Sequence, residues 1–214
     1  MKKIIALLLT LAFAAVAVSC AGKTSSNGAS AQKSSGGAQN AQTQETKERL
    51  KMRKVEIKIK DYGTIKLELD PNEAPITVEN FMKLVNEKFY DGLTFHRIIE
   101  GFMMQGGDPR GDGTGGSEEH IKGEFKSNGV NNNISHKRGV ISMARSGNPN
   151  SASSQFFICH QDSEFLDGEY AAFGHVTEGL DVVDKVCTSA EVIDGNGTVA
   201  AGKKPVIESI REIK

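Results

Sequence analysis

The chain has 214 residues, with 26 lysine and arginine residues against 27 aspartate and glutamate residues, and a formal net charge of −1 at pH 7. This length predicts one domain with room for extensions. Nucleic-acid binding needs a clustered basic surface, and the balanced charge gives no sign of one. We therefore expect no nucleic-acid partner. Tryptophan is absent, so large apolar contacts must come from phenylalanine, methionine and aliphatic residues.

A secretory leader is predicted at residues 1–19. Two lysines open it, and residues 4–18 are almost entirely apolar, a run shorter than the roughly 20 residues of a membrane-spanning helix. The end of this run and the two residues after it, Ala17-Val18-Ser19-Cys20, resemble a bacterial lipobox. Cleavage before Cys20 would then leave this cysteine for lipid attachment. The alternative is an ordinary signal peptide cut near Ala17 or Ser19.

Residues 20–46 predict a flexible tether. They are rich in serine, glycine, alanine, glutamine and asparagine, with almost no large apolar side chain. Such a composition cannot bury enough surface to offset the entropy of ordering the chain. We therefore expect a folded domain at residues 47–214, held outside the cytoplasm as a membrane-anchored lipoprotein by Cys20, facing the periplasm or the cell surface.

The folded domain is predicted to begin with two strands and a helix. Apolar and charged residues alternate over residues 55–60 and again over 65–70, with a tight turn between them, which is typical of half-buried strands. From Pro75 or Thr77 the apolar residues recur at the spacing of one helix face. These helical residues are Val78, Phe81, Met82 and Val85.

The stretch Phe95–Asp108 is the first candidate for a functional site. It combines one arginine, a run of apolar side chains and one glutamine, divided by glycines at Gly101 and at 106–107. A charged fork beside bulky apolar groups suits a site that binds an apolar ligand and stabilises one of its polar atoms. Periodicity alone favours an ordinary strand, bend and strand, because apolar runs bounded by glycine usually belong to the core. Both interpretations stay open here.

The rest of the chain adds short strands and one more helix. A long glycine-rich loop is predicted at residues 109–133, where Ile121 and Phe125 are the expected anchors, because loops of this length in a compact domain are usually functional or disordered. Further strands are predicted at 140–144, 155–159, 171–176 and 206–210, a short helix at 179–186, and a loop at 188–204. Many short strands without strand-helix alternation predict a closed antiparallel barrel.

Cysteines and histidines carry little further signal. Cys159 lies in an apolar run, which favours a buried free thiol. The five histidines are scattered and have no spacing typical of a zinc motif. We therefore expect no metal.

Eight short motifs follow one another between residues 54 and 214. They are Phe95-His96-Arg97-Ile98-Ile99, Gly101-Phe102-Met103, Gln105-Gly106-Gly107-Asp108, Gly113-Thr114-Gly115-Gly116, Ser142-Met143-Ala144, Ser154-Gln155-Phe156-Phe157-Ile158, Phe165-Leu166-Asp167-Gly168 and Phe173-Gly174-His175-Val176. In this order they resemble the cyclophilin family of peptidyl-prolyl cis-trans isomerases. The resemblance implies a mainly β fold, a closed eight-stranded antiparallel barrel capped by two α-helices. It also implies an enzyme that accelerates rotation about Xaa-Pro bonds in unfolded or exposed polypeptide without a cofactor.

The resemblance also implies roles for individual residues. Arg97 would donate to the amide being twisted, and Gln105 would orient Arg97 and the substrate carbonyl, so these two are the expected catalytic residues. The expected substrate-binding residues are Phe102, Met103, Ala144, Arg145, Gln155, Phe157, Phe165, Leu166 and Tyr170. Of these, Phe102, Met103, Phe157 and Leu166 would line the pocket for the proline ring. For His96 we expect a structural role, because neighbouring residues on a strand point to opposite faces.

Three positions depart from the well-known eukaryotic members. Phe165 stands where many have tryptophan, Tyr170 where many have histidine, and Arg145 where many have asparagine. Because Phe165 lacks the indole N–H donor, we expect cyclosporin to bind weakly at most. Phenylalanine and tyrosine at these places resemble bacterial members, and we expect the isomerase activity to be kept.

Two functions from different classes therefore follow from the sequence. The first is an isomerase that acts on proline-containing polypeptides, as a monomer, outside the cytoplasm. The alternative is a peptide-binding or chaperone-like module with incidental isomerase activity, which would be favoured if the apolar pocket survived without its arginine. Arg97 is present, so the enzyme is our first prediction.

Overall fold

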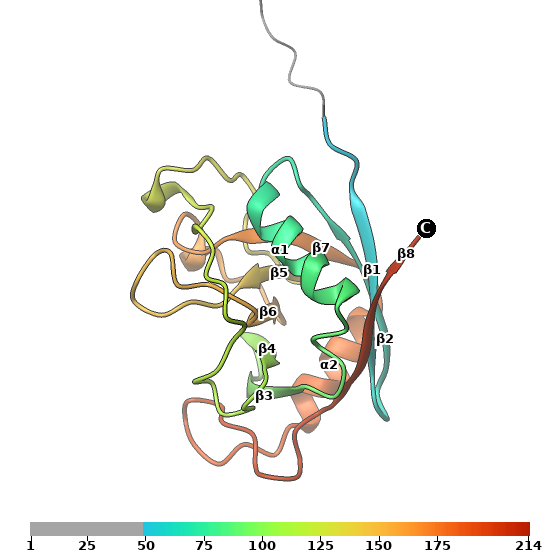
Figure 1. Cartoon of the computed structure of the whole chain (residues 1–214). Coiled ribbons are helices and arrows are strands. Elements are labelled where there is room, and N and C mark those ends of the chain that lie inside the picture. Colours follow the sequence, from blue (N-terminus) through green and yellow to red (C-terminus); the bar gives the residue numbers. More distant parts are fainter. Residues whose placement is uncertain (1–48) are drawn as a thin grey trace, which may run out of the picture. The chain divides into compact units, whose positions relative to one another are not determined.

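The computed structural model describes residues 49–214 (Figure 1). The predicted leader at 1–19, the lipid attachment at Cys20 and the tether at 20–46 lie outside the described residues. Within residues 49–214, neither helix combines the length and the hydropathy that crossing a bilayer requires.

Eight antiparallel strands and two α-helices make up the fold, as predicted. The strands are β1 (Arg53–Ile59), β2 (Gly63–Leu69), β3 (Thr94–Ile99), β4 (Met103–Asp108), β5 (Val140–Met143), β6 (Phe156–Cys159), β7 (Ala172–Glu178) and β8 (Ile207–Ile213). The helices are α1 (Pro75–Asn86) and α2 (Leu180–Ser189), with short 3₁₀ turns at Lys126–Asn128 and Glu164–Leu166. The strands form one sheet in the order β3-β4-β6-β5-β7-β2-β1-β8.

The sheet curls but stays open, so the prediction of a closed barrel was wrong. Its two end strands, β3 and β8, share no ladder, and an isolated bridge joins Thr94 of β3 to Val206, the residue before β8. Beyond that bridge, the segment before β8 occupies the edge of β3. The Ile98 N–H donates to the Gly197 carbonyl at 2.8 Å, and the Val199 N–H donates to the His96 carbonyl at 3.0 Å. Because these backbone groups of β3 already have partners, β8 cannot extend its ladder to them.

Helix α1 is capped by a side chain from the long loop. The Glu124 carboxylate, which is buried, accepts hydrogen bonds from the N–H groups of Ile76 at 3.0 Å and Thr77 at 2.7 Å. A carboxylate at a helix N-terminus satisfies free N–H groups and interacts favourably with the helix dipole. Ile121 and Phe125, the predicted anchors, are also buried. The loop is therefore fixed in place, and it forms a wall of the site described below.

Strands β4 and β6 bury both of their faces, each in a different cluster. Met104, Phe156 and Ile158 pack in the main core together with residues of α1 and α2. Their neighbours Met103, Phe157 and Cys159 point the opposite way, as alternation along a strand requires, into a second, smaller apolar cluster. This second cluster forms the floor of the candidate site.

Both cysteines of the described residues are buried and free, which confirms the prediction for Cys159. Burial raises the pKa of the Cys159 thiol to about 12 and that of Cys187 also to about 12. Both therefore stay protonated and behave as small apolar side chains.

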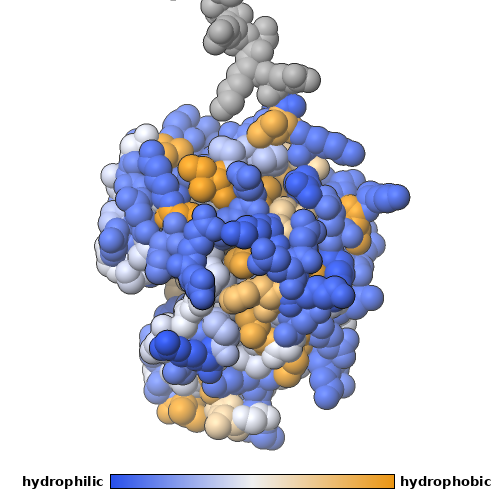
Figure 2. All heavy atoms as spheres, in the orientation of Figure 1, coloured by the Kyte–Doolittle hydropathy of each residue, from blue (hydrophilic) through white to orange (hydrophobic). Residues whose placement is uncertain are grey.

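The outer surface carries few large apolar residues. Figure 2 shows a face covered mainly by hydrophilic residues, with hydrophobic residues in small separate areas. The large apolar side chains that are exposed between residues 49 and 214 are Leu50, Ile76, Phe165, Val192 and Ile193. Phe165, which is 72% exposed, lies at the candidate site.

Candidate functional site

Arg97 and Gln105 face each other across the β3–β4 ladder. The pairing shifts register between Phe95 and Arg97, which takes up His96 and sets Arg97 opposite Gln105. The Arg97 Nη1 donates to the Gln105 Oε1 at 3.3 Å, and the Arg97 Nε donates to the Asn196 carbonyl at 2.8 Å. Its Nη2 has no hydrogen-bond partner within residues 49–214. The guanidinium is thus held at two points with one terminal nitrogen free to bind a ligand.

Burial lowers the pKa of Arg97, while the electrostatic interactions with Tyr170 and Asp194 oppose this shift. A guanidinium titrates so far above neutrality that it still carries its charge at pH 7. The free Nη2 is therefore a charged donor in a partly dry environment, where electrostatic interactions are stronger than in water.

Ten of the predicted site residues line one cavity of about 330 Å³, which we call the apolar cavity. They are Arg97, Phe102, Met103, Gln105, Ala144, Arg145, Phe157, Phe165, Leu166 and Tyr170. Phe157 forms its floor and meets Tyr170 edge-on, with ring centroids 6.0 Å apart. The exposed ring of Phe165 lies 5.5 Å from that of Phe102 and forms one side of the opening. A flat apolar ring of modest size fits such a space.

Phe157 is supported from behind by a histidine that the sequence did not suggest. The His136 ring stacks on Phe157 at 6.1 Å, its Nδ1 lies 2.8 Å from the Asp167 carboxylate, and its Nε2 lies 3.0 Å from the Ser142 hydroxyl. Burial lowers the pKa of His136, and the hydrogen bond with Asp167 opposes this. Both ring nitrogens have partners, so His136 fixes the position of the cavity floor. No local sequence pattern signals this role.

The guanidinium of Arg145, unlike that of Arg97, is occupied by contacts within the protein. It lies over the rings of Phe125 at 5.1 Å and Tyr170 at 4.7 Å, an arrangement typical of cation–π contacts. Its Nε donates to the Glu169 carbonyl at 3.0 Å, and its Nη1 donates to the Ser146 carbonyl at 2.9 Å. Because these internal contacts occupy it, Arg145 acts as a wall of the cavity.

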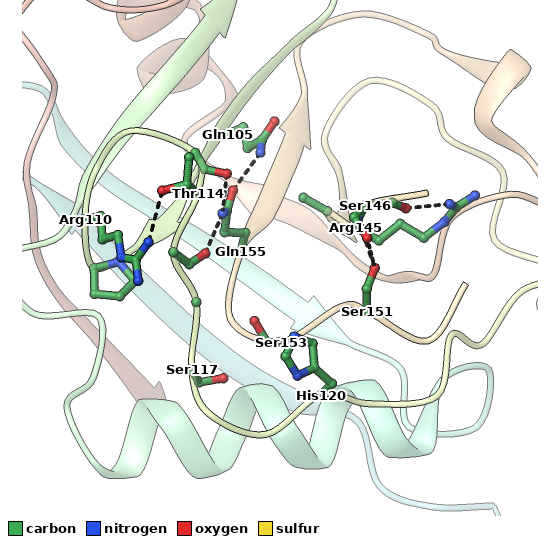
Figure 3. A pocket seen from close by; sticks show the side chains of 15 residues that line it. Gln105, Arg110, Thr114, Ser117, His120, Arg145, Ser146, Ser151, Ser153 and Gln155 are labelled. Atoms are coloured by element: carbon green, nitrogen blue, oxygen red, sulfur yellow. Dashed lines mark hydrogen bonds between the residues drawn. The ribbon is translucent and has the colours of Figure 1, made fainter. Parts of the chain in front are cut away.

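Gln155 is the one predicted site residue of the folded domain that does not line the apolar cavity. It lies in a neighbouring cavity (Figure 3). Its Nε2 donates to the carbonyls of Gly113 at 3.1 Å and Gly115 at 2.7 Å, while its Oε1 accepts from the Gln105 Nε2 at 2.8 Å. Gln155 thus joins the glycine loop to Gln105, and through it to Arg97.

The neighbouring cavity, which we call the polar cavity, measures about 400 Å³. Its labelled side chains in Figure 3 are Gln105, Arg110, Thr114, Ser117, His120, Arg145, Ser146, Ser151, Ser153 and Gln155. No carboxylate lines it. Gln105, Ala144 and Arg145 also line the apolar cavity, so one ligand can reach both.

The sequence did not predict the polar cavity. Its residues come from the glycine-rich segment 109–120 and from the polar loop 144–155, neither of which has a periodic pattern. Their only signal was composition, with the motif Gly113–Gly116 left without a role. Gly115 and Gly116 show one reason for these glycines, since an added Cβ would overlap Asp108 at the first and Ser153 at the second.

Comparisons with known proteins agree on one family. Residues 54–211 match the family described as cyclophilin type peptidyl-prolyl cis-trans isomerase/CLD. A peptidyl-prolyl cis-trans isomerase of Helicobacter pylori is 50% identical over 126 residues, covering 58% of this chain and 74% of the relative. Peptidyl-prolyl cis-trans isomerase B of Bacillus subtilis is 49% identical over 123 residues, covering 58% of this chain and 82% of the relative.

A solved structure extends the similarity to most of the described residues. It is the crystal structure of a Cryptosporidium parvum cyclophilin type peptidyl-prolyl cis-trans isomerase in the presence of the dipeptide Ala-Pro. It superposes with a TM-score of 0.67 at 30% identity, covering 75% of this chain and 99% of that one.

Proposed function

The chain belongs to the cyclophilin-type peptidyl-prolyl cis-trans isomerases, and we propose that it accelerates Xaa-Pro rotation in unfolded or exposed polypeptides outside the cytoplasm. An Xaa-Pro bond is held planar by resonance behind a barrier of about 18–20 kcal/mol, and uncatalysed rotation takes tens to hundreds of seconds. Lowering that barrier requires no covalent intermediate. It requires groups that bind the twisted amide more tightly than either planar form.

Arg97 is the proposed catalytic donor. In the twisted amide the proline nitrogen loses resonance and regains a lone pair, which a charged N–H can stabilise. The free Nη2 of Arg97 beside the apolar cavity is the single observation that carries this proposal. Gln105 holds Nη1 and is proposed to orient both Arg97 and the substrate carbonyl. Lysine would be a poor replacement, because its ammonium lacks the rigid planar fork.

The apolar cavity is proposed to hold the proline ring while the other side of the bond rotates. Phe102, Met103, Phe157 and Leu166 supply its apolar lining, and burial of a proline ring against them is favourable by about 25 cal/mol per Å². Ala144 and the backbone of Arg145 would meet the peptide next to the proline. Phe165 and Tyr170 would close the opening, and Gln155 would act through Gln105.

The proposed substrates are proline-containing polypeptides. The Cryptosporidium parvum relative was crystallised in the presence of Ala-Pro, and the apolar cavity here has a volume suited to one such ring. We propose weak binding of cyclosporin at most, because Phe165 offers no indole N–H. We also propose that the enzyme acts as a monomer.

The extracytoplasmic location is proposed from residues 1–46 alone. The leader-like residues 1–19, the lipobox-like Ala17–Cys20 and the low-complexity stretch after them support a lipoprotein held on a membrane by Cys20. If so, Cys20→Ser should move the protein from the membrane fraction to the soluble fraction. An unchanged membrane fraction would contradict the lipid anchor and leave the isomerase proposal untouched.

The catalytic proposal is tested by a protease-coupled isomerase assay on a proline-containing tetrapeptide. We expect Arg97→Ala to lower kcat/KM by about 10²–10³-fold, the usual effect of removing one transition-state donor. Arg97→Lys should recover little of the loss. Wild-type protein that gave only the uncatalysed rate would refute the enzyme. Aggregation suppression that persists undiminished in Arg97→Ala would instead support the chaperone-like alternative.

A further inference from the structure

We propose that Asp194 is a positioning residue for the isomerase reaction, because it sets the Asn196 carbonyl that holds the Nε of Arg97. This inference rests on the proposed catalytic role of Arg97. It concerns a part of the chain, residues 188–204, that the sequence predicted to be only a loop.

Residues 191–200 form a small β-hairpin. The Ile193 N–H donates to the Thr198 carbonyl at 2.9 Å, and the Ala200 N–H donates to the Glu191 carbonyl at 2.8 Å. Between these two bonds Val192 and Val199 form an antiparallel bridge. The tip of the hairpin is therefore residues 194–197, between α2 and β8 (Figure 1).

The tip and the second arm of this hairpin are docked on β3 on both sides of Arg97. Gly197 accepts from the N–H of Ile98, and Val199 donates to the carbonyl of His96, so the backbone on each side of Arg97 is bonded to the hairpin. Gly197 has φ +83°, and a Cβ there would overlap the Ile98 carbonyl. Only glycine allows the tip to approach β3 this closely.

Asp194 organises the tip by hydrogen bonds to its own turn. Its Oδ1 accepts from the N–H groups of Asn196 and Thr198, both at 3.0 Å, and its carbonyl accepts from the N–H of Gly197 at 3.2 Å. These bonds fix the peptide unit that carries the Asn196 carbonyl. That carbonyl is the acceptor, 2.8 Å away, for the Nε of Arg97.

The carboxylate keeps its charge under the conditions of the reaction. Hydrogen bonds from the backbone and side chain of Thr198 lower the pKa of Asp194. Its negative charge in turn raises the pKa of Arg97 against the effect of burial. Because the guanidinium keeps its charge at pH 7 in any case, Asp194 acts on it mainly through its position.

Two fixed points determine where the third nitrogen points. A guanidinium is planar and rigid, so holding Nε at Asn196 and Nη1 at Gln105 fixes the direction of Nη2. Without the first contact, the long arginine side chain can swing while Gln105 still holds one end. Misplacement of a catalytic group by about 1 Å can cost up to about 10²-fold in rate.

The test compares two substitutions at Asp194 with a matched control. We expect Asp194→Ala to lower kcat by about tenfold with KM changed less than about twofold, because the contact affects geometry more than affinity. Asp194→Asn keeps an Oδ1 acceptor and should retain activity within about twofold. The control is Asp70→Ala, which removes a similar turn contact, Oδ1 to the Asn72 N–H at 2.8 Å, at the end of β2. It should leave kcat unchanged.

A double substitution separates positioning from a general structural role. In the Arg97→Ala background, adding Asp194→Ala should have no further effect on the residual rate, since the residue acts only through Arg97. An equal further loss there, or full kcat in a folded Asp194→Ala protein, would overturn the inference. Full activity in Arg97→Ala would instead refute the catalytic proposal on which it rests.

A second measurement remains informative if Asp194→Ala folds poorly. In nitrogen-15 NMR spectra of the wild type, the Arg97 Nε–H should exchange slowly with water because it is hydrogen-bonded. Gly197→Ala, which displaces the tip from β3 and keeps the Asp194 side chain, should speed that exchange and lower kcat together. Faster exchange with unchanged kcat would contradict the proposal.

Discussion

The apolar cavity and the polar cavity share one wall but are built from different parts of the chain. The apolar cavity takes Arg97, Met103, Gln105 and Phe157 from β3, β4 and β6, and the rest of its lining from the turn at Phe102 and the segments 144–145 and 165–170. The strands β4 and β6 face two apolar clusters at once. The polar cavity stands on the segment 109–120 and the loop 144–155, held by hydrogen bonds between glycine carbonyls, hydroxyls and amides. The first is fixed by packing and the second by local polar contacts.

This difference separates two tasks. A cavity whose floor is made of strand side chains and lies in an apolar cluster can change little there without loss of folding, which suits the part of the site that binds an invariant proline ring. A cavity made of loops can change its lining residues while the sheet stays the same, which suits contacts to the variable residues before the proline. Gln105, Ala144 and Arg145 belong to both, so the two tasks meet there.

Phe157→Ala should give the largest effect of four changes that probe this comparison. The ring is buried and forms the cavity floor, so we expect the free energy of unfolding to fall by about 3–4 kcal/mol. We expect kcat/KM to fall by about 10²-fold, since about 2–3 kcal/mol of apolar contact with the proline is lost. Chemical denaturation and the coupled assay measure these quantities.

Phe165→Ala is the matched control for that change. Its ring is 72% exposed, so its loss should cost less than about 1 kcal/mol of stability and a smaller part of the activity. A folded Phe157→Ala protein with full activity would show that proline does not bind in the apolar cavity.

Gln155→Ala should have an intermediate effect, because Gln155 connects the two cavities. Losing its bonds to Gly113, Gly115 and Gln105 frees the glycine loop and removes one of the contacts that hold Gln105. We expect kcat/KM to fall by about tenfold on every peptide, as for a residue that positions a catalytic group. Gln155→Glu separates the two connections, since a carboxylate still accepts from Gln105 but cannot donate to the glycine carbonyls. Equal loss in both variants would assign the effect to the glycine loop.

Arg110→Glu should change the selectivity for charged peptides while leaving the rate on an uncharged peptide unchanged. The polar cavity is lined by Arg110 and Arg145 and by no carboxylate. Wild-type enzyme should therefore favour a peptide with glutamate two residues before proline over one with lysine, by about threefold at low salt. The substitution should reverse this preference and leave an alanine peptide unaffected. Lys60→Glu is the control, because it makes an equal charge change at an exposed residue just after β1. A preference that survives Arg110→Glu would place the discrimination elsewhere.

Sequence reasoning predicted the apolar cavity far better than the polar one, for a physical reason. The family resemblance, carried by the order of the motifs, grouped Arg97, Phe102, Gln105 and Phe157, and the period of the strands predicted the sheet that supports them. Loop residues such as Arg110 have no period, and their meeting across the polar cavity depends on turns fixed by long-range hydrogen bonds. Composition alone could not show which of them would face one another.

The open edge of the sheet was missed for a related reason. Whether β3 pairs with β8 or with the hairpin 191–200 is a competition between two segments for the same backbone groups. Both contain short apolar stretches, so local sequence favours neither. The outcome depends on Gly197, whose lack of a Cβ permits the close approach of the hairpin to β3. This role cannot be predicted from a single glycine in a loop.

Acid should weaken the protein through one histidine under each cavity, and this is the smallest effect. His96 is buried below Gly113 of the polar cavity, and neither of its ring nitrogens has a hydrogen-bond partner among the described residues. Burial lowers the pKa of His96, as it does for His136 under the apolar cavity. The unfolded chain, with pKa near 6.5, then binds more protons than the folded one. Stability is complete above that pH and falls as the pH drops below it.

His96→Leu tells the two cavities apart in this respect. The Asp167 carboxylate lies 2.8 Å from the His136 Nδ1 and can hydrogen-bond to its proton. Asp108 and Asp112 favour a proton on His96 only through electrostatic interactions, which Lys204 and Arg97 oppose, so we expect His96 to carry the larger share of the acid sensitivity. The slope of the unfolding free energy between pH 7 and pH 5, at most about 1.4 kcal/mol per pH unit for each proton, should be shallower in His96→Leu. Denaturation series at several pH values measure it. An unchanged slope in His96→Leu would show that the acid sensitivity comes from His136, under the apolar cavity, and not from His96, under the polar cavity.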